Sequence, residues 1–340
     1  MVSDVAPQPP DDLELGHRLV LHEARAQLGP GRELRDLGDG WLLHDRADPE
    51  PFWNRLMAPR WPAAAEAFDR RLDEVITLFS TLGRLSHVRP APAGNQPLDL
   101  VPRLRAAGFD RVGEDRRMVL VDPAICLALA DAPLPPRVAV ERLPGPRPDL
   151  VPERHPGHPS HENGRDAAAG VVGPRRPSGP RRRRWSRPGD PPMGDLPMGD
   201  LAGLAAIRSP GWAREVAAIL AEAFGVEPMR RLALESDALA FVERGKGSLV
   251  LLREDGEAVA VARGTSRDGG TYLSSIATRP ERQGRGFGAL ATAIAVADAM
   301  AIGDRVIHLA VETSNERAVG IYLRLGFRLV GDPIPDLLLR

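Results

Sequence analysis

The sequence predicts an α/β protein with a mixed sheet of the α+β kind, built from two similar domains that a disordered segment joins. Three observations predict this fold. The chain has 340 residues, roughly enough for two domains of about 150. Strand-like and helix-like patterns alternate along its C-terminal part. A weak internal repeat also links the two halves.

The C-terminal part, residues 201–340, gives the clearest pattern of elements. Ser209 and Pro210 suit the N-cap and first position of a helix, and Gly225 lies where that helix should stop. Further helices are expected over 229–242, 289–302 and 315–325. Strands are expected over 248–252, 258–262, 271–278, 306–311, 327–330 and 336–339, the first two as a hairpin.

The N-terminal part, residues 1–136, gives weaker signals of the same kind. Its expected strands are 34–44, 52–57, 85–88 and 118–121, and its expected helices are 63–79 and 102–107. A loop and a helix separate His87 from Gly108-Phe109, and the same order separates His308 from Gly326-Phe327. We interpret this agreement as a duplication.

Residues 144–200 form a Pro/Gly/Arg-rich segment that includes the run Arg181–Arg184. Such a composition buries too little apolar area to offset the entropy of ordering, so we expect disorder. A solvated linker is the simplest interpretation, and a nucleic-acid-binding arm, an insertion or a reading-frame artefact are the alternatives. If residues 137–142 are the first strand of the second domain, the segment is an insertion in a strand-to-helix loop; otherwise it is a plain interdomain linker.

Composition excludes several classes of protein. A net charge of −1 argues against a dedicated nucleic-acid binder, which usually carries a clear basic excess. No window approaches about 18 consecutive apolar residues, which excludes a membrane span. The acidic, Pro-rich stretch Met1–Leu15 does not resemble a secretory signal. Cys126 is the only cysteine, which excludes a disulfide framework and favours a cytoplasmic protein.

Two further residue types add to this. His44, His87 and His308 do not have the spacing of metal ligands, so we expect no metal. Lys246 is the only lysine among many arginines, a bias typical of GC-rich, bacterial coding sequences. The sequence gives no indication of the oligomeric state.

The most informative stretch joins the strand 271–278 to the helix that follows. Its loop contains Gln283, Gly284, Arg285, Gly286, Phe287 and Gly288. Glycines let successive backbone N–H groups turn toward one point, and a helix N-terminus adds donors and a positive dipole end. Arg282 and Arg285 add positive charge at the rim. The loop therefore predicts an anion cradle for a pyrophosphate, with a spacing that fits neither a P-loop nor a dinucleotide-binding fingerprint.

Two motifs carry a family resemblance. Gln283-x-x-Gly286-x-Gly288 after a strand resembles the acyl-CoA signature of the GCN5-related N-acetyltransferase (GNAT) superfamily. The run from Asn315 through Tyr322 to Gly326-Phe327 resembles the second signature of that superfamily. The close resemblance covers about residues 248–340. It implies a GNAT fold, in a tandem arrangement with a degenerate N-terminal copy and a catalytic copy over 201–340.

The resemblance also implies roles for the residues. The strand end Ile276, Ala277 and Thr278 would separate from the strand 306–311 and bind the pantetheine arm of acetyl-CoA. Residues 282–288 would hold the pyrophosphate, and Asn315 would bind pantetheine or fix its loop. Tyr322, seven residues after Asn315, would be the general acid that protonates the leaving thiolate. The implied reaction is direct attack on acetyl-CoA by a primary amine of a small molecule or a peptide.

The general base is left unassigned. Family members often carry a glutamate on the strand before the Gly-rich loop, but this strand reads Tyr272-Leu273-Ser274-Ser275. Ser274 or Ser275 with water, or Glu312, are the candidates. The N-terminal half has no Gly-rich loop and has Leu104 opposite Tyr322, so we expect no cofactor site there. The alternative function is a non-catalytic acyl-CoA-binding sensor or scaffold.

Overall fold

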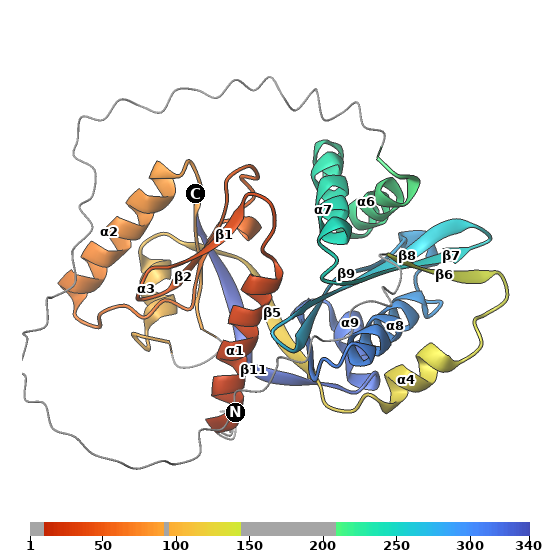
Figure 1. Ribbon diagram of the computed structural model, residues 1–340. Coiled ribbons are helices and arrows are strands. Elements are labelled where there is room, and N and C mark those ends of the chain that lie inside the picture. Colours follow the sequence, from red (N-terminus) through yellow and green to blue (C-terminus); the bar gives the residue numbers. More distant parts are fainter. Residues whose placement is uncertain (1–9, 92–94, 144–208) are drawn as a thin grey trace, which may run out of the picture. The chain divides into compact units, whose positions relative to one another are not determined.

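The computed structural model describes residues 10–91, 95–143 and 209–340 (Figure 1). The whole segment predicted to be disordered, 144–200, lies outside these residues. Within the described ranges eleven strands form one mixed sheet in the order β1-β2-β3-β4-β11-β5-β10-β9-β8-β7-β6. The predicted class, an α/β protein with a mixed sheet, is confirmed.

The C-terminal half supplies one end of this sheet. Its strands are β6 (Val138–Leu143), β7 (Gly247–Glu254), β8 (Glu257–Arg267), β9 (Gly270–Thr278), β10 (Val306–Glu312) and β11 (Phe327–Leu339). Its helices are α6 (Gly211–Phe224), α7 (Arg231–Arg244), α8 (Phe287–Ala301) and α9 (Glu316–Arg324). Strands β6 to β9 pair antiparallel, and β10 pairs parallel to β9.

Helices cover both faces of this half (Figure 1). Leu249 and Leu251 of β7 pack in a cluster with α6 and α7, while Val250 and Leu252 pack in a cluster with α8. Alternation of side chains along a strand explains this division. Helix α8 is apolar on nearly every side, because the sheet, α4 and α9 all lie against the cluster that contains it.

The N-terminal half repeats the order of elements. Its strands are β1 (Arg32–Asp36), β2 (Trp41–Asp45), β3 (Arg55–Met57), β4 (Ser86–Arg89) and β5 (Asp110–Leu120), and its helices are α1 (Pro10–Ala26), α2 (Ala65–Thr81), α3 (Leu100–Ala106) and α4 (Ala124–Asp131). As for β7, β8 and β9 in the other half, three antiparallel strands are followed by a helix, a parallel strand, a helix and a last strand. The internal repeat predicted from the two Gly-Phe pairs is therefore present as a tandem arrangement.

The two halves exchange their last strands. Strand β5 of the N-terminal half pairs with β10, and β11 of the C-terminal half pairs with β4. The two exchanged strands also pair with each other over most of their length, from Phe327 opposite Leu120 to Leu338 opposite Asp110. All described residues belong to one compact unit.

The pairing of strand β6 shows where the segment after it is connected to the fold. Residues 138–143 pair with β7 in an unbroken antiparallel register, from Val138 opposite Glu254 to Leu143 opposite Leu249. The strand expected over residues 137–142 is thus present as β6, one residue later at each end. Residues 144–208 therefore connect a strand of the C-terminal sheet to its first helix, which favours the insertion over the plain interdomain linker.

Several boundaries differ from the prediction. Helix α6 begins at Gly211 with Pro210 as its N-cap, although its end at Gly225, with a φ of 64°, is as predicted. The expected strand 34–44 is the hairpin of β1 and β2, which turns through Gly38. The two expected last strands are one strand, β11, with an irregularity between Val330 and Ile334.

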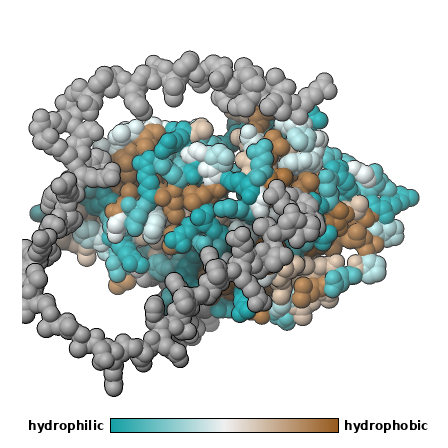
Figure 2. Space-filling view, in the orientation of Figure 1, coloured by the Kyte–Doolittle hydropathy of each residue, from teal (hydrophilic) through white to brown (hydrophobic). Residues whose placement is uncertain are grey.

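Helices α1 and α4 were missed by the sequence prediction. The buried face of α1 carries Glu23 among its apolar residues, and Gln27, also buried, directly follows the helix, which interrupts the apolar period. Helix α4 has only eight residues, and its first turn is fixed by a hydrogen bond from the Ala124 N–H to the Asp122 side chain. Among the described residues no helix is both long and apolar enough to cross a membrane. Figure 2 shows hydrophobic residues in separate groups between hydrophilic ones on the face drawn.

Candidate active site

Strands β9 and β10 separate at the end that leads into the Gly-rich loop. They pair from Gly270 opposite Val306 to Leu273 opposite Leu309, and not beyond. At the same place β9 has an extra residue relative to β8, and Ser275 has a φ of 52°. This β-bulge turns the last residues of β9 away from β10. One backbone edge of β9 is therefore left without a strand partner, as predicted.

The Gly-rich loop turns directly into α8. Gly284 and Gly286 have φ values of 84° and 86°, a region that other residues rarely adopt. Gly286 is the N-cap, so the first N–H groups of α8 have no partner within the helix and are exposed at its N-terminus. Gly288 lies close to β9, since a Cβ there would be 3.3 Å from Thr278 Oγ1. The sequence thus builds a set of backbone donors on a rigid, buried helix.

A cavity of about 340 Å³ lies between this loop, the end of β9 and α9. It is lined by the predicted residues Ile276, Ala277, Thr278, Arg282, Gln283, Gly284, Gly286, Phe287, Gly288, Asn315 and Tyr322. Residues that were not predicted also line it, namely Ala289, Arg317, Ala318, Ile321 and Arg324. The predicted residues Arg285 and Glu312 lie outside it.

The two arginines of the loop have carboxylate partners. Arg285 forms a two-pronged ion pair with Glu254, whose side chain is only 11% exposed, and one of its contacts is 2.7 Å. Arg282 contacts Glu254 at 3.0 Å and Glu257 at 2.9 Å. Both carboxylates lie at the turn between β7 and β8. The positive charge that the sequence indicated at the rim of the loop is therefore paired within the protein.

Arg317 and Arg324 bring positive charge to the cavity from α9. Arg317 Nη1 donates to Gln283 Oε1 at 3.2 Å, and Gln283 Nε2 lies 3.4 Å from the carbonyl oxygen of Thr278. No carboxylate of the described residues contacts either arginine. Sequence reasoning missed both, although positions 317, 321 and 324 fall on one side of the predicted helix and could have indicated them.

Asn315 is the N-cap of α9. Its side-chain oxygen accepts a hydrogen bond from the Ala318 N–H at 3.1 Å, which satisfies one of the free donors of the helix. Of the two roles considered for Asn315, fixing its loop is therefore the one seen in the structure. Its side-chain N–H₂ group has no partner among the described residues and is free for a ligand.

Tyr322 lines the cavity. It is 8% exposed and packs edge-to-face on Phe327, with ring centroids 5.9 Å apart. Burial raises the pKa of its phenol to about 12, so the hydroxyl is protonated at neutral pH. The fold thus presents a buried proton donor to the cavity.

The candidate bases lie apart from the cavity. Glu312 is the exposed last residue of β10, with Oε1 4.0 Å from the position that a Cβ on Gly113 would take. It points to the face opposite Val311, which packs in the cluster that contains Tyr322. Ser274 Oγ accepts a hydrogen bond from Arg263 Nε at 3.1 Å. No carboxylate of the described residues lines the cavity.

In the N-terminal half the equivalent space is filled. Where β9 and β10 separate, the ends of β3 and β4 stay joined by a bond from Ala58 N to Arg89 O, and the segments that follow them by one from Trp61 N to Gln96 O. The side chains of Trp61, Phe68, Leu100 and Leu104 are buried in one apolar cluster there. Leu104, which takes the place of Tyr322 in the repeat, is fully buried. This packing leaves no open strand edge for a pantetheine arm.

Comparison with known protein families gives a match to the C-terminal half of the chain. Residues 194–327 match the acetyltransferase (GNAT) family. The C-terminal half is a GNAT domain. No curated protein matches the sequence. No group of His, Cys, Asp and Glu among the described residues is arranged to hold a metal ion.

Solved structures share the fold over nearly the whole length of this chain. A GCN5-related N-acetyltransferase from Kribbella flavida is 18% identical, with 95% of each chain covered and a TM-score of 0.57. A conserved protein of unknown function from Staphylococcus epidermidis is 10% identical, with 93% of this chain and 97% of that chain covered and a TM-score of 0.57. At these identities the similarity shows the fold alone.

Proposed function

We propose that the protein is an N-acetyltransferase that transfers the acetyl group of acetyl-CoA to a primary amine of a small molecule or a peptide. The observation that carries this proposal is the cavity, because it joins an open strand edge, a set of free backbone donors and a buried phenol. An acyl donor with an amide-rich arm, a diphosphate and a thioester would use the strand edge for the arm, the backbone donors for the diphosphate and the phenol for the thioester.

Different residues of the cavity would bind different parts of acetyl-CoA. The N–H groups of residues 283–288 would bind the diphosphate, and the open edge of Ile276, Ala277 and Thr278 would bind the pantetheine amides. The free amide N–H₂ of Asn315 would donate to a pantetheine carbonyl. In this arrangement the thioester lies next to Tyr322.

The reaction is a direct displacement at the thioester carbonyl. The neutral amine attacks the carbonyl carbon, so the C–N bond forms as the C–S bond breaks. Tyr322 donates to the leaving thiolate as general acid. Because its pKa is about 12, the phenol acts mainly by its hydrogen bond to the sulfur as negative charge develops there. The proton of the attacking amine leaves to water, because Glu312, the carboxylate considered as base, lies outside the cavity.

The N-terminal half has a supporting role in this proposal. It would be a degenerate copy over residues 1–136 that binds no acyl donor, because Trp61 and Leu104 fill the equivalent space. It supplies β5, which completes the sheet beside β10. A cytoplasmic, bacterial enzyme, as the composition indicates, would find acetyl-CoA in its own compartment.

Replacing Tyr322 with Phe tests the proposal. We expect thiol release from acetyl-CoA with a responsive amine to fall about 100-fold, because the hydrogen bond to the thiolate is lost. The affinity for acetyl-CoA, measured by calorimetry, should not change. The chain's other tyrosine, Tyr272, is a matched control because it is buried but does not line the cavity. Tyr272→Phe should retain most of the turnover.

The second candidate, a non-catalytic acyl-CoA sensor or scaffold, is favoured by the lack of a carboxylate among the described lining residues. Acetyl-CoA binding without thiol release on any amine of a broad panel would support the sensor and contradict the enzyme. Correctly folded protein that binds neither CoA nor acetyl-CoA at millimolar concentration would contradict both.

A further inference from the structure

The four arginines near the cavity fall into two pairs with different surroundings. Arg282 and Arg285 have carboxylate partners at the β7–β8 turn. Arg317 and Arg324 lie on the cavity wall formed by α9 and have no carboxylate partner among the described residues. A phosphate competes with a carboxylate for the same guanidinium donors. The two pairs are therefore not equivalent toward an anionic ligand.

The ion pairs of the loop oppose its use as a phosphate site. Glu254 is nearly buried, and both loop arginines contact it. If Arg285 turned toward a ligand, the Glu254 carboxylate would lose its two-pronged partner in a place where water cannot fully replace it. Arg285 also lies over the Phe287 ring, 5.2 Å from its centroid. These contacts fix the loop in shape and direct Arg285 away from the cavity.

Arg317 is held beside the backbone donors of the loop. Its Nη2 lies 3.5 Å from the position that a Cβ on Gly284 would take. Its other terminal nitrogen donates to Gln283, which in turn reaches the Thr278 carbonyl. Gln283 therefore acts as a strut between β9 and α9. A neutral amide partner positions the guanidinium without cancelling its charge.

Arg324 reaches the cavity by folding back along α9. Its Nη1 lies 3.5 Å from the position that a Cβ on Gly320 would take, one turn before it. The missing side chain at Gly320 leaves room for the guanidinium on the face that also carries Ile321. The guanidinium of Arg324 therefore lies beside Gly320, whereas that of Arg317 lies beside Gly284 of the loop, so the two charges occupy different places on the cavity wall.

We propose that Arg317 and Arg324 bind the phosphate groups of the acyl donor, and that Arg282 and Arg285 only hold the loop in shape. Arg317 binds the diphosphate, together with the backbone donors that it lies beside. Arg324, the second cavity-lining arginine without a carboxylate partner among the described residues, binds the 3′-phosphate of CoA, the phosphate group that remains once the diphosphate is held at the loop. This inference rests on the proposed function, because it names the cations that recognise the donor of that reaction.

Calorimetric titration of the full chain with CoA and with 3′-dephospho-CoA tests the proposal. Arg317→Ala should weaken the binding of both ligands at least 10-fold and reduce the salt dependence of binding. Arg324→Ala should weaken CoA to the affinity of 3′-dephospho-CoA, whose own binding should change less than threefold. Arg285→Ala is the matched control, because it removes the same charge from the same region. It should bind both ligands within threefold of wild type, while its thermal midpoint falls.

The opposite results would overturn the assignment. These are CoA affinity reduced more by Arg285→Ala than by Arg317→Ala, with both variants folded by circular dichroism, or Arg317→Ala binding within twofold of wild type. An Arg324→Ala variant that still prefers CoA over 3′-dephospho-CoA by the wild-type factor would overturn the role of Arg324. Failure of the proposed function is distinguishable, since wild-type protein would then bind neither ligand.

Discussion

Glu23 of α1 is a buried carboxylate surrounded by guanidinium groups. It is 1% exposed, with Arg55 Nη2 at 3.0 Å, Arg117 Nη2 at 2.6 Å and Arg89 Nη1 at 3.7 Å from its oxygens. Burial by itself would raise the pKa of Glu23, but Arg117, Arg55 and Arg89 together lower it to about 2. The carboxylate is therefore ionised in the folded protein at every pH at which the protein is expected to work.

We predict that Glu23→Gln lowers the free energy of unfolding at pH 7 by about 3–5 kcal/mol, because buried guanidinium groups lose their counter-charge. The folded pKa of about 2 lies below the ordinary value of 4.5, so ionised Glu23 stabilises the fold above pH 4.5. This contribution is lost as the pH falls from 4.5 toward 2. Urea unfolding of wild type and variant at pH 7, 4 and 3 measures it.

The difference between wild type and Glu23→Gln should shrink as the pH falls through this range. The control is Glu66→Gln on the exposed side of α2, which should leave the free energy of unfolding within about 0.5 kcal/mol at each pH. A difference for Glu23→Gln that is independent of pH between 7 and 3 would show that the ionised carboxylate does not stabilise the fold.

At the scale of elements, the two Gly-Phe turns of the repeat differ in what surrounds them. Gly108 and Gly326 each end a helix and begin an exchanged strand, with nearly equal φ values of 93° and 91°. A Cβ on Gly108 would meet only the end of the Leu339 side chain, at 3.5 Å. A Cβ on Gly326 would overlap the backbone carbonyl of Asp122, and the Gly326 carbonyl accepts hydrogen bonds from Val121 N and Asp122 N.

We predict that Gly108→Ala lowers the free energy of unfolding by about 1–2 kcal/mol, the cost of a positive φ for alanine. Gly326→Ala should cost at least about 2 kcal/mol more, because backbone must also move. Equal losses would mean that the close approach of β11 to Asp122 has no energetic weight. If Gly326→Ala does not fold without ligand, the thermal midpoints of both variants are compared in saturating acetyl-CoA instead.

The sequence predicted best where one element determines its own conformation. The Gly-rich loop, the helix after it and the position of Tyr322 follow from local glycines and helix spacing, so they were predictable. Arg282 and Arg285 were expected at the ligand because their partner Glu254 lies 28 and 31 positions away in sequence. Helix α1 was missed for a related reason, since Glu23 is acceptable in a core only because three distant arginines surround it.

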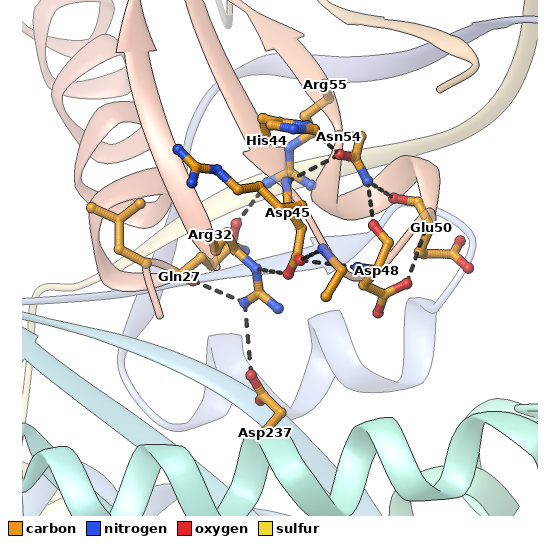
Figure 3. A network of polar contacts seen from close by, with 12 residues as sticks. Gln27, Arg32, His44, Asp45, Asp48, Glu50, Asn54, Arg55 and Asp237 are labelled. Carbon is orange, nitrogen blue, oxygen red and sulfur yellow. Dashed lines mark hydrogen bonds and ion pairs between the residues drawn. The ribbon is translucent and has the colours of Figure 1, made fainter. Parts of the chain in front are cut away.

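At the scale of the whole molecule, strands and side chains both join the halves. Strand β5 lies between β10 and β11, so neither half completes its sheet alone. A polar network between residues of the N-terminal half and Asp237 of α7 adds to this (Figure 3). Arg32 contacts Asp45 at 3.1 Å within the N-terminal half and Asp237 of α7 at 3.7 Å. Arg230, just before α7, contacts Asp48 at 2.9 Å.

We predict that the halves unfold together, in one transition by scanning calorimetry. Separating them breaks the pairing of β5 with β10 and of β11 with β4, which leaves exchanged strands with unpaired backbone groups.

Acetyl-CoA binds only the C-terminal half in our proposal, yet it should raise the midpoint of the entire transition. At 100 times its dissociation constant the added stability should be about 2.7 kcal/mol. In a variant with Trp185 and Trp212 replaced by Phe, tryptophan fluorescence reports the N-terminal half, because the remaining Trp41, Trp53 and Trp61 lie there, and it should show the same shift. Two transitions, of which the ligand moves one while the fluorescence midpoint stays fixed, would show that the strand exchange does not couple the halves.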